Sequence, residues 1–296
     1  MITSEDKKAI LAYLAVCFFW GSTYLAIRIG VQVVPPFIFA ATRLIIAGAL
    51  VLIYSKIKGY DFPKTKKEYR RISIVGILLL VGGNGLVVFS EQWLPSGIAS
   101  LIVACVPLFM AIIEVGILKM KRISLRGVLG LIIGFGGVVF LVLNGGIIGE
   151  THFLGVIIIL IAAFSWSAGS VYSKTFKLDC SIIVSIGIQM LVAGIVLFAV
   201  GAIRGEISQV EWTMQGILSI VYLITFGSIV GYSSYIYVLS KWPAARAGTY
   251  AYVNPIVAVI LGSIFLQEKI TVNMVISMFV ILTGVLLVQK SKIDNV

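Results

Sequence analysis

Long apolar runs separated by short polar segments dominate this chain. Each run is close to the roughly 20 residues that a helix needs to cross the hydrocarbon of a bilayer. Strand-like alternation of apolar and polar positions is absent, which argues against a membrane barrel. The pattern predicts an all-α integral membrane protein with ten transmembrane helices, at about 9–28, 36–54, 72–93, 96–118, 124–143, 153–173, 181–203, 212–239, 243–266 and 272–289.

Identical residues recur in the same order in the two halves of the chain, at an offset that drifts by only two positions. The offset is close to half of the 296 residues. The matched residues are Trp20 and Trp166, Ala47-Gly48 and Ala193-Gly194, Pro95 and Pro243, Pro107 and Pro255, and Gly137-Val138 and Gly284-Val285. This series predicts two five-helix repeats, at 1–147 and 148–296, as in transporters built from internal repeats.

Composition agrees with a chain that faces lipid. Hydrophobic residues make up 60% of it, charged residues 12%, and the mean hydropathy is +1.10. A soluble domain is about 45–50% apolar and about 25% charged. The net charge of +11 does not indicate nucleic-acid binding, because the basic residues lie between apolar runs, where they set topology and contact anionic lipid.

The basic residues predict the orientation. Nineteen of the 23 Lys and Arg residues fall on one side of the predicted spans, three on the other, and Arg43 within a span. By the positive-inside rule, both termini are expected in the cytoplasm. Because each half has five spans, an odd number, the second half must enter the membrane from the opposite side. The repeats are therefore predicted to be inverted, which permits alternating access to a site near the midplane.

Polar and aromatic residues inside the spans are the candidates for lining a cavity. Asn84 lies among glycines in span three and needs partners, so it either lines a cavity or hydrogen-bonds to a neighbouring helix. Tyr232 and Tyr235 share one face of span eight. Trp20 and Trp166 occupy matching places, and each is followed by small residues. The other three candidates are Ser22, Tyr250 and Asn254.

Pro107 and Pro255 lie at matching places in spans four and nine. Each removes a backbone donor and frees a carbonyl near mid-membrane, where it must face protein or water. Their pairing predicts two hinges beside a binding site. Tyr250 and Asn254 are four residues apart and share a helix face.

The spans contain few charges. Arg43 and Glu91 are both placed toward the outer side, so the two are expected to be able to pair. Glu114 lies near the inner end of span four and is expected to extend toward Lys119. The sequence shows no convincing carboxylate at the midplane, and the driving force therefore stays open.

Motifs for other classes of protein are absent from the sequence. It has no GxxxxGK[ST] phosphate loop, no GxSxG and no HExxH, so an ATP-driven pump is excluded and an enzyme is not expected. Cys17, Cys105 and Cys180 are too far apart in sequence for a metal motif. We predict no metal and no cofactor. Glycines along span five predict a packing face, either within the fold or between two protomers, so a monomer and a homodimer both stay open.

Several short segments together form a familiar pattern: Phe19-Trp20-Gly21-Ser22-Thr23-Tyr24, Thr42-Arg43-Leu44, Asn254-Pro255, Gly262 and Phe265-Leu266-Gln267-Glu268-Lys269-Ile270-Thr271. In this order they resemble the drug/metabolite transporter superfamily, and within it the EamA-type family of ten-helix transporters. The first repeat departs from the family where Met120-Lys121-Arg122 stands in place of an expected Glu before a basic residue.

The resemblance implies a multi-pass bacterial inner-membrane exporter of small metabolites, such as amino acids, or of drug-like solutes. It also implies a central cavity between spans one, three, four, six, eight and nine. Two alternatives stay open: an uptake permease of the same fold, and a membrane scaffold or sensor that does not transport. The sequence names neither the cargo nor a coupling ion.

Overall fold

The first half of the chain folds into five helical rods, separated by short turns. The structure is a computed structural model that describes residues 4–114, 124–144, 150–242 and 244–290. The helices of the first half are α1 (Ser4–Gly30), α2 (Pro36–Ile57), α3 (Lys66–Gly76), η1 (Ile77–Gly85), α4 (Leu86–Ser90), α5 (Ser96–Val103), α6 (Val106–Ile112) and α7 (Leu125–Asn144).

The second half repeats this order with five more rods. Its helices are α8 (Glu150–Ser173), α9 (Ile182–Ile203), η3 (Glu206–Gln209), α10 (Met214–Tyr222), η4 (Leu223–Tyr232), α11 (Ser233–Lys241), α12 (Ala244–Ala247), η5 (Gly248–Tyr252), α13 (Asn254–Leu266) and α14 (Val272–Lys290). The segments α3–η1–α4 and α10–η4–α11 each form one continuous rod, and α5–α6 and η5–α13 each form one rod that is interrupted before a proline. The ten predicted spans are therefore present, and Pro243 lies outside the described residues.

The rods have the length and the surface of membrane helices. Eight helices in the described part of the chain are long and apolar enough to cross a bilayer, and two shorter apolar helices, Ser96–Ile112 and Val272–Val288, complete the set. Large apolar side chains such as Phe18, Ile132 and Phe279 are each more than 60% exposed. Apolar surface on this scale is stable against lipid and not against water, so the protein is a multi-pass, all-α membrane protein.

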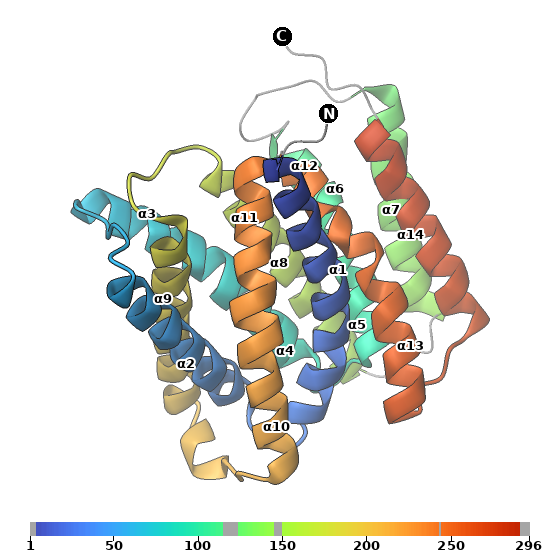
Figure 1. Ribbon diagram of the computed structural model, residues 1–296. Helices are drawn as coiled ribbons and strands as arrows, with labels where there is room; N and C mark the ends of the chain where they lie inside the picture. The colour runs from blue at the N-terminus through green and yellow to red at the C-terminus, as the bar shows by residue number, and fades with distance from the viewer. Residues whose placement is uncertain (1–3, 115–123, 145–149, 243, 291–296) are drawn as a thin grey trace.

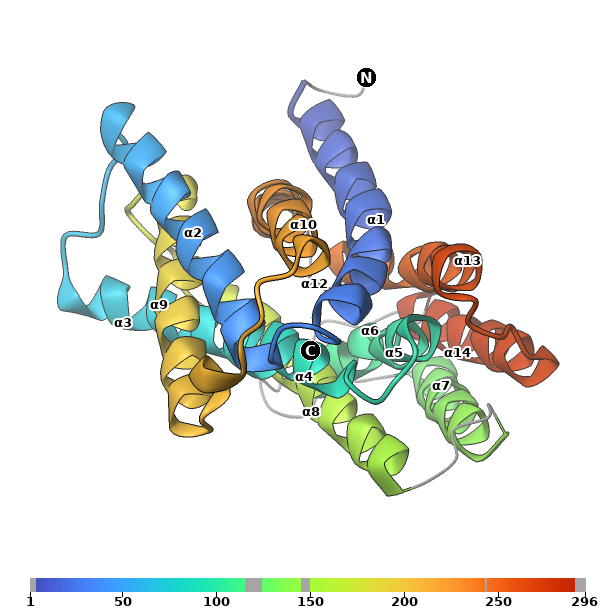
Figure 2. The same ribbon diagram turned by 90° about the horizontal axis from the view of Figure 1, so that it is seen from below.

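Two helix pairs flank a core of six rods. The second span of each repeat packs against its counterpart, α2 on α9, and the fifth spans pair likewise, α7 on α14. Figures 1 and 2 show these pairs on opposite sides of the bundle, with the other rods between them. We call the end where α1 begins and α14 ends the terminal end, and the opposite end the distal end (Figure 1).

Glycine contacts show that the repeats are related by a pseudo-two-fold axis. A Cβ added to Gly48 would lie 2.8 Å from the backbone nitrogen of Leu191. Its counterpart, a Cβ on Gly194, would lie 2.9 Å from the backbone nitrogen of Ile45. Gly48 and Gly194 are 146 positions apart, and so are Ile45 and Leu191. The two halves therefore make the same contact in exchanged roles. The prediction of two inverted five-helix repeats is confirmed.

The glycines of span five pack within the fold. A Cβ on Gly284 of α14 would lie 2.3 Å from the backbone nitrogen of Gly134 on α7, closer than any real side chain allows. Gly137 makes the matching approach to Ile281. Of the two alternatives for this face, intramolecular packing is the one that the structure shows.

The core rods depart from regular α-helix at matching places. Spans three and eight contain the π-helical segments η1 and η4, and both segments include glycines. Spans four and nine break one turn before a proline, so that Pro107 and Pro255 each lie in the first turn of the following helix. Proline is tolerated there because the first turn needs no donor.

Carboxylates cap two helices at the distal end. Glu206 accepts hydrogen bonds from the backbone nitrogens of Phe37 and Ile38, at the start of α2 (2.9 and 3.1 Å). Glu268 accepts from the backbone nitrogens of Ser96 and Gly97, at the start of α5 (2.8 and 3.1 Å). Each carboxylate satisfies orphan donors and the positive end of the helix dipole.

Candidate functional site

A cavity lies at the centre of the six-rod core. About 70 Å³ of it is open to the centres of water-sized molecules. At roughly 10–15 Å³ per water on this measure, the cavity has room for about five waters. Its lining residues are Trp20, Thr23, Tyr24, Ile27, Arg43, Leu44, Leu80, Gly83, Asn84, Val87, Val103, Val106, Ala162, Ala163, Trp166, Gly227, Ser228, Tyr232, Tyr250 and Asn254. They come from the spans named by the resemblance, and also from span two.

Four aromatic rings, those of Trp20, Trp166, Tyr232 and Tyr250, line the cavity toward the terminal end, and Tyr235 packs behind them. Trp20 and Trp166 meet edge to face with ring centroids 5.2 Å apart. Tyr235 lies 5.2 Å from both tryptophan rings, and Tyr250 lies 5.0 Å from Trp20. Tyr232 completes the group, 6.3 Å from Trp166. Because Trp20 and Trp166 are mates in the two repeats and touch each other, the pseudo-two-fold axis passes between them.

Each tryptophan packs on a glycine from the other repeat. A Cβ on Gly83 of η1 would lie 2.7 Å from the Trp166 ring, and one on Gly231 of η4 would lie 2.4 Å from Nε1 of Trp20. A β-carbon fits at neither position. The glycines of spans three and eight therefore let the two indole rings reach the axis.

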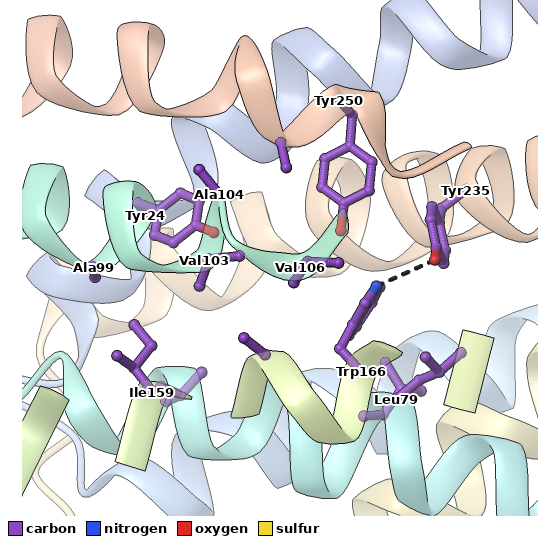
Figure 3. Close-up of a cluster of buried hydrophobic side chains, with 14 of the residues drawn as sticks. Tyr24, Leu79, Ala99, Val103, Ala104, Val106, Ile159, Trp166, Tyr235 and Tyr250 are labelled. Atoms are coloured by element: carbon purple, nitrogen blue, oxygen red, sulfur yellow. Dashed lines mark hydrogen bonds between the residues drawn. The ribbon is translucent and has the colours of Figure 1, made fainter. Parts of the chain in front are cut away.

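The two indole N–H groups have different partners. Trp20 Nε1 donates to the backbone carbonyl of Gly227 at 3.0 Å. Trp166 Nε1 donates to the Tyr235 hydroxyl at 3.2 Å (Figure 3). This hydroxyl also bonds with Ser170 Oγ at 2.6 Å. Buried indoles are held in place by such bonds, so the aromatic wall is rigidly positioned.

Arg43 and Asn84 form a polar pair on the distal side of the cavity. The Nη2 group of Arg43 donates to Oδ1 of Asn84, so Asn84 both lines the cavity and bonds to a neighbouring helix. The predicted pairing with Glu91 is wrong in its geometry: neither carboxylate oxygen of Glu91 has a hydrogen-bond partner in the described structure. Glu91 lies beyond the end of α4, whereas the Arg43 side chain is directed at the middle of span three.

The corresponding pair in the second repeat is Gln189 with Tyr232. The Tyr232 hydroxyl donates to Oε1 of Gln189 at 2.5 Å, and Gln189 donates in turn to Ser185 Oγ at 2.9 Å. Gln189 was not among the candidates from sequence. Gln189 lies 146 residues after Arg43, the same offset that separates Trp166 from Trp20. This repeat offset could have identified Gln189 as a candidate from sequence.

The breaks beside Pro107 and Pro255 are each bridged by a side chain. The amide nitrogen of Asn254 faces two carbonyl oxygens, those of Tyr250 at 3.2 Å and Cys17 at 3.1 Å. In span four, Ser167 Oγ donates to the carbonyl of Val106 at 3.0 Å. These bonds tie each break to a neighbouring helix, α8 in the first half and α1 in the second.

Two of the predicted lining residues, Ser22 and Tyr235, lie outside the cavity lining, and so does the intramembrane charge Glu114. Ser22 is turned away, because its hydroxyl bonds to the carbonyl of Phe19 and to the hydroxyl of Tyr222. Tyr235 is fully buried behind Trp166. Glu114 is near the terminal end, where it acts electrostatically on Lys174; its expected neighbour Lys119 lies outside the described residues.

A membrane protein whose two inverted halves enclose a polar and aromatic cavity is built as a transporter. The sequence matches the EamA-like transporter family twice, over residues 7–143 and again over 153–289. The chain belongs to this family, as the resemblance predicted, and it is a membrane transporter.

Known relatives agree with this assignment. The chain is 37% identical over 282 residues to the "Uncharacterized inner membrane transporter YedA" of Escherichia coli (strain K12), covering 95% of this chain and 90% of that one. It is 25% identical to the "Uncharacterized transporter YoaV" of Bacillus subtilis (strain 168), covering 94% and 95%. A solved crystal structure shares the fold with a TM-score of 0.69 at 19% identity, covering 95% and 97%. These names point to transport rather than catalysis.

Proposed function

We propose that the protein is a secondary transporter that exports small organic metabolites, such as amino acids and related compounds, or drug-like solutes. The observation that carries this proposal is the position of the cavity, on the pseudo-two-fold axis between matched irregular helices. The breaks at Pro107 and Pro255 lie beside it in opposite halves. Two near-equivalent halves around one site can exchange open and closed shapes, which is alternating access.

The lining supports an amphipathic cargo. Aromatic rings offer stacking surfaces, while Asn84, Ser228 and Asn254 offer polar contacts. The space is too small for such a cargo in this conformation. We infer that the structure represents a closed shape and that binding widens the cavity.

The orientation follows from the charges. The loops at the terminal end are rich in Lys and Arg, whereas those at the distal end carry Arg28, Arg204 and Lys269. By the positive-inside rule, this distribution supports an orientation with the terminal end and both termini in the cytoplasm of a bacterial cell. The protein is proposed to function as a monomer or a homodimer in the inner membrane.

The proposal is tested by growth of a host that overproduces the chain on a panel of toxic amino acids, analogues and cationic dyes. We expect increased tolerance to at least one class of compound, lost in Trp166→Ala at equal protein abundance. Trp212→Ala is the matched control, because Trp212 is 55% exposed and lies outside the bundle core. Increased sensitivity would instead indicate an uptake permease, and unchanged growth throughout would favour a scaffold or sensor.

A further inference from the structure

Arg43 lines the cavity with most of its hydrogen-bonding capacity unused. A guanidinium has five N–H donors, and in the described structure Arg43 makes one hydrogen bond, to Asn84. Its Nε is buried with no partner. The side chain as a whole is 3% exposed. A Cβ added to Gly227 would lie 3.8 Å from Nη1, so the guanidinium reaches from span two to span eight.

The charge of Arg43 is not balanced within the cavity. Of the described residues that line the cavity, Arg43 alone carries a charge. Glu91 is close enough to act on it electrostatically, yet its two oxygens are buried and have no hydrogen-bond partner. An ionised carboxylate in that position would be strongly destabilised, and such a group takes up a proton instead. A protonated Glu91 leaves the guanidinium without a counter-ion.

The remaining walls favour a ligand with one anionic end and an apolar body. Guanidinium and carboxylate match in geometry, because two parallel N–H groups can bind the two oxygens. Aromatic rings form the opposite wall, toward the terminal end. A phosphate would be poorly matched, since one cation and a small cavity would face a doubly charged group.

We propose that the cavity binds small organic carboxylates, with Arg43 and Asn84 as the carboxylate site, and that Glu91 is protonated when the anion is bound. This assignment rests on the proposed transport function and names the class of its cargo. Because binding of the proton and of the anion favour each other, the two are thermodynamically linked, and the linkage is reciprocal.

The direction of the linkage follows from the charges around Glu91. The groups that act on it are Arg28 from α1, Arg43 from α2 and Glu268 from the turn before α14; Tyr24 of α1 lies close by. When Glu91 loses its proton, its negative charge compensates Arg43 and repels a bound carboxylate. Anion binding is therefore expected to weaken as the pH rises, over a range in which the ligand itself stays ionised.

The test uses the full-length protein in detergent, with a series of arylalkyl carboxylates such as 3-phenylpropionate and the matched primary amides. Binding is followed by tryptophan fluorescence and by thermal shift. We expect at least one carboxylate to bind tenfold or more tightly than its amide. Arg43→Gln should abolish this preference, whereas Arg43→Lys should keep part of it. Arg126→Gln, on an exposed α7 position, is the matched control and should keep all of it.

Two further variants separate a binding role from a folding role. Asn84→Asp is nearly isosteric and keeps a partner for Arg43, but its charge should remove the carboxylate preference. Glu91→Gln mimics the protonated group and should bind the carboxylate at all pH values tested, without the loss at high pH. Equal binding of acids and amides, binding of neither, or a preference that survives in Arg43→Gln would overturn the carboxylate site. The growth test above would still decide whether the protein transports.

Discussion

The polar pairs on the two sides of the cavity occupy equivalent places and differ in chemistry. Arg43 with Asn84 joins spans two and three, and Gln189 with Tyr232 joins spans seven and eight. The first pair carries a charge and the second is neutral. The repeated sequence thus gives the two halves the same backbone arrangement. The residues that differ between the repeats give the cavity one charged side and one neutral side. We therefore expect the specificity of the site to depend on the positions where the repeats differ.

The largest effect, a loss of folded protein, is expected where a substitution disrupts the packing between the two repeats. Gly284→Ala would place a methyl group 2.3 Å from the backbone of Gly134, which no side-chain movement relieves. We expect a severe loss of folded protein, measured as monodisperse material extracted from membranes. Gly136→Ala is the control, because nothing lies within 4 Å of its Cβ position. Normal amounts of the Gly284 variant would contradict the tight α7–α14 contact.

The next largest effect concerns the matched helix breaks. If Pro107 and Pro255 are hinges, Pro107→Ala and Pro255→Ala should each lower flux several-fold at equal protein level, because hinge changes alter transport without removing the binding groups. Equal effects would support a symmetric role in the two halves. Pro36→Ala is the matched control, since Pro36 begins α2 at the distal end. Unchanged flux in both variants would show that the prolines are tolerated kinks and not hinges.

A smaller effect is expected on the neutral side of the cavity. Tyr232→Phe leaves the buried Gln189 carbonyl without its donor and should destabilise the protein by about 1 kcal/mol. The measurement is the thermal midpoint in detergent. Tyr252→Phe is the contrasting control, because the buried Tyr252 hydroxyl has no hydrogen-bond partner among the described residues and its removal should cost nothing. Equal losses in the two variants would show that the Gln189 bond is not what stabilises Tyr232.

The smallest expected effect is on the rate at which a maleimide labels Cys180, at the terminal end. Burial, followed by the nearby Glu68 carboxylate, raises the pKa of the Cys180 thiol to about 11. The thiolate is therefore scarce at neutral pH, and maleimide labelling should speed up about tenfold per pH unit below that pKa. The variant Cys17→Ala/Cys105→Ala isolates this signal. A membrane-impermeant maleimide should leave Cys180 unlabelled in intact cells if the terminal end is cytoplasmic.

Regular spacing made much of the fold predictable from sequence. Runs near 20 residues located the spans, and pairs such as Trp20 with Trp166 revealed the repeat. The π-helical segments were not predicted, because they leave the apolar pattern intact while rotating the residues that follow. The partner of Arg43 was assigned wrongly for a related reason. Arg43 and Glu91 were expected to pair because their predicted depths in the membrane are similar. The direction of a side chain cannot be predicted from its depth.

The parts of the site that could not be predicted from sequence are those that depend on contacts between helices distant in the chain. The carboxylate caps depend on Glu206 and Glu268 meeting helix starts more than 160 residues away. Ser22 was expected in the lining because it follows Trp20, yet its hydroxyl is taken by Tyr222 of span eight. Such partners follow from the packed bundle and not from any local pattern.

The contact between Trp20 and Trp166 has a mechanical consequence. Under a motion that exchanges the shapes of the two halves, points far from the symmetry axis travel furthest and points on it stay in place. If the protein works by alternating access, the paired rings, 5.2 Å apart at their centroids, are expected to be a pivot common to both open states. A transported solute would then be expected to pass beside this pivot rather than between its rings.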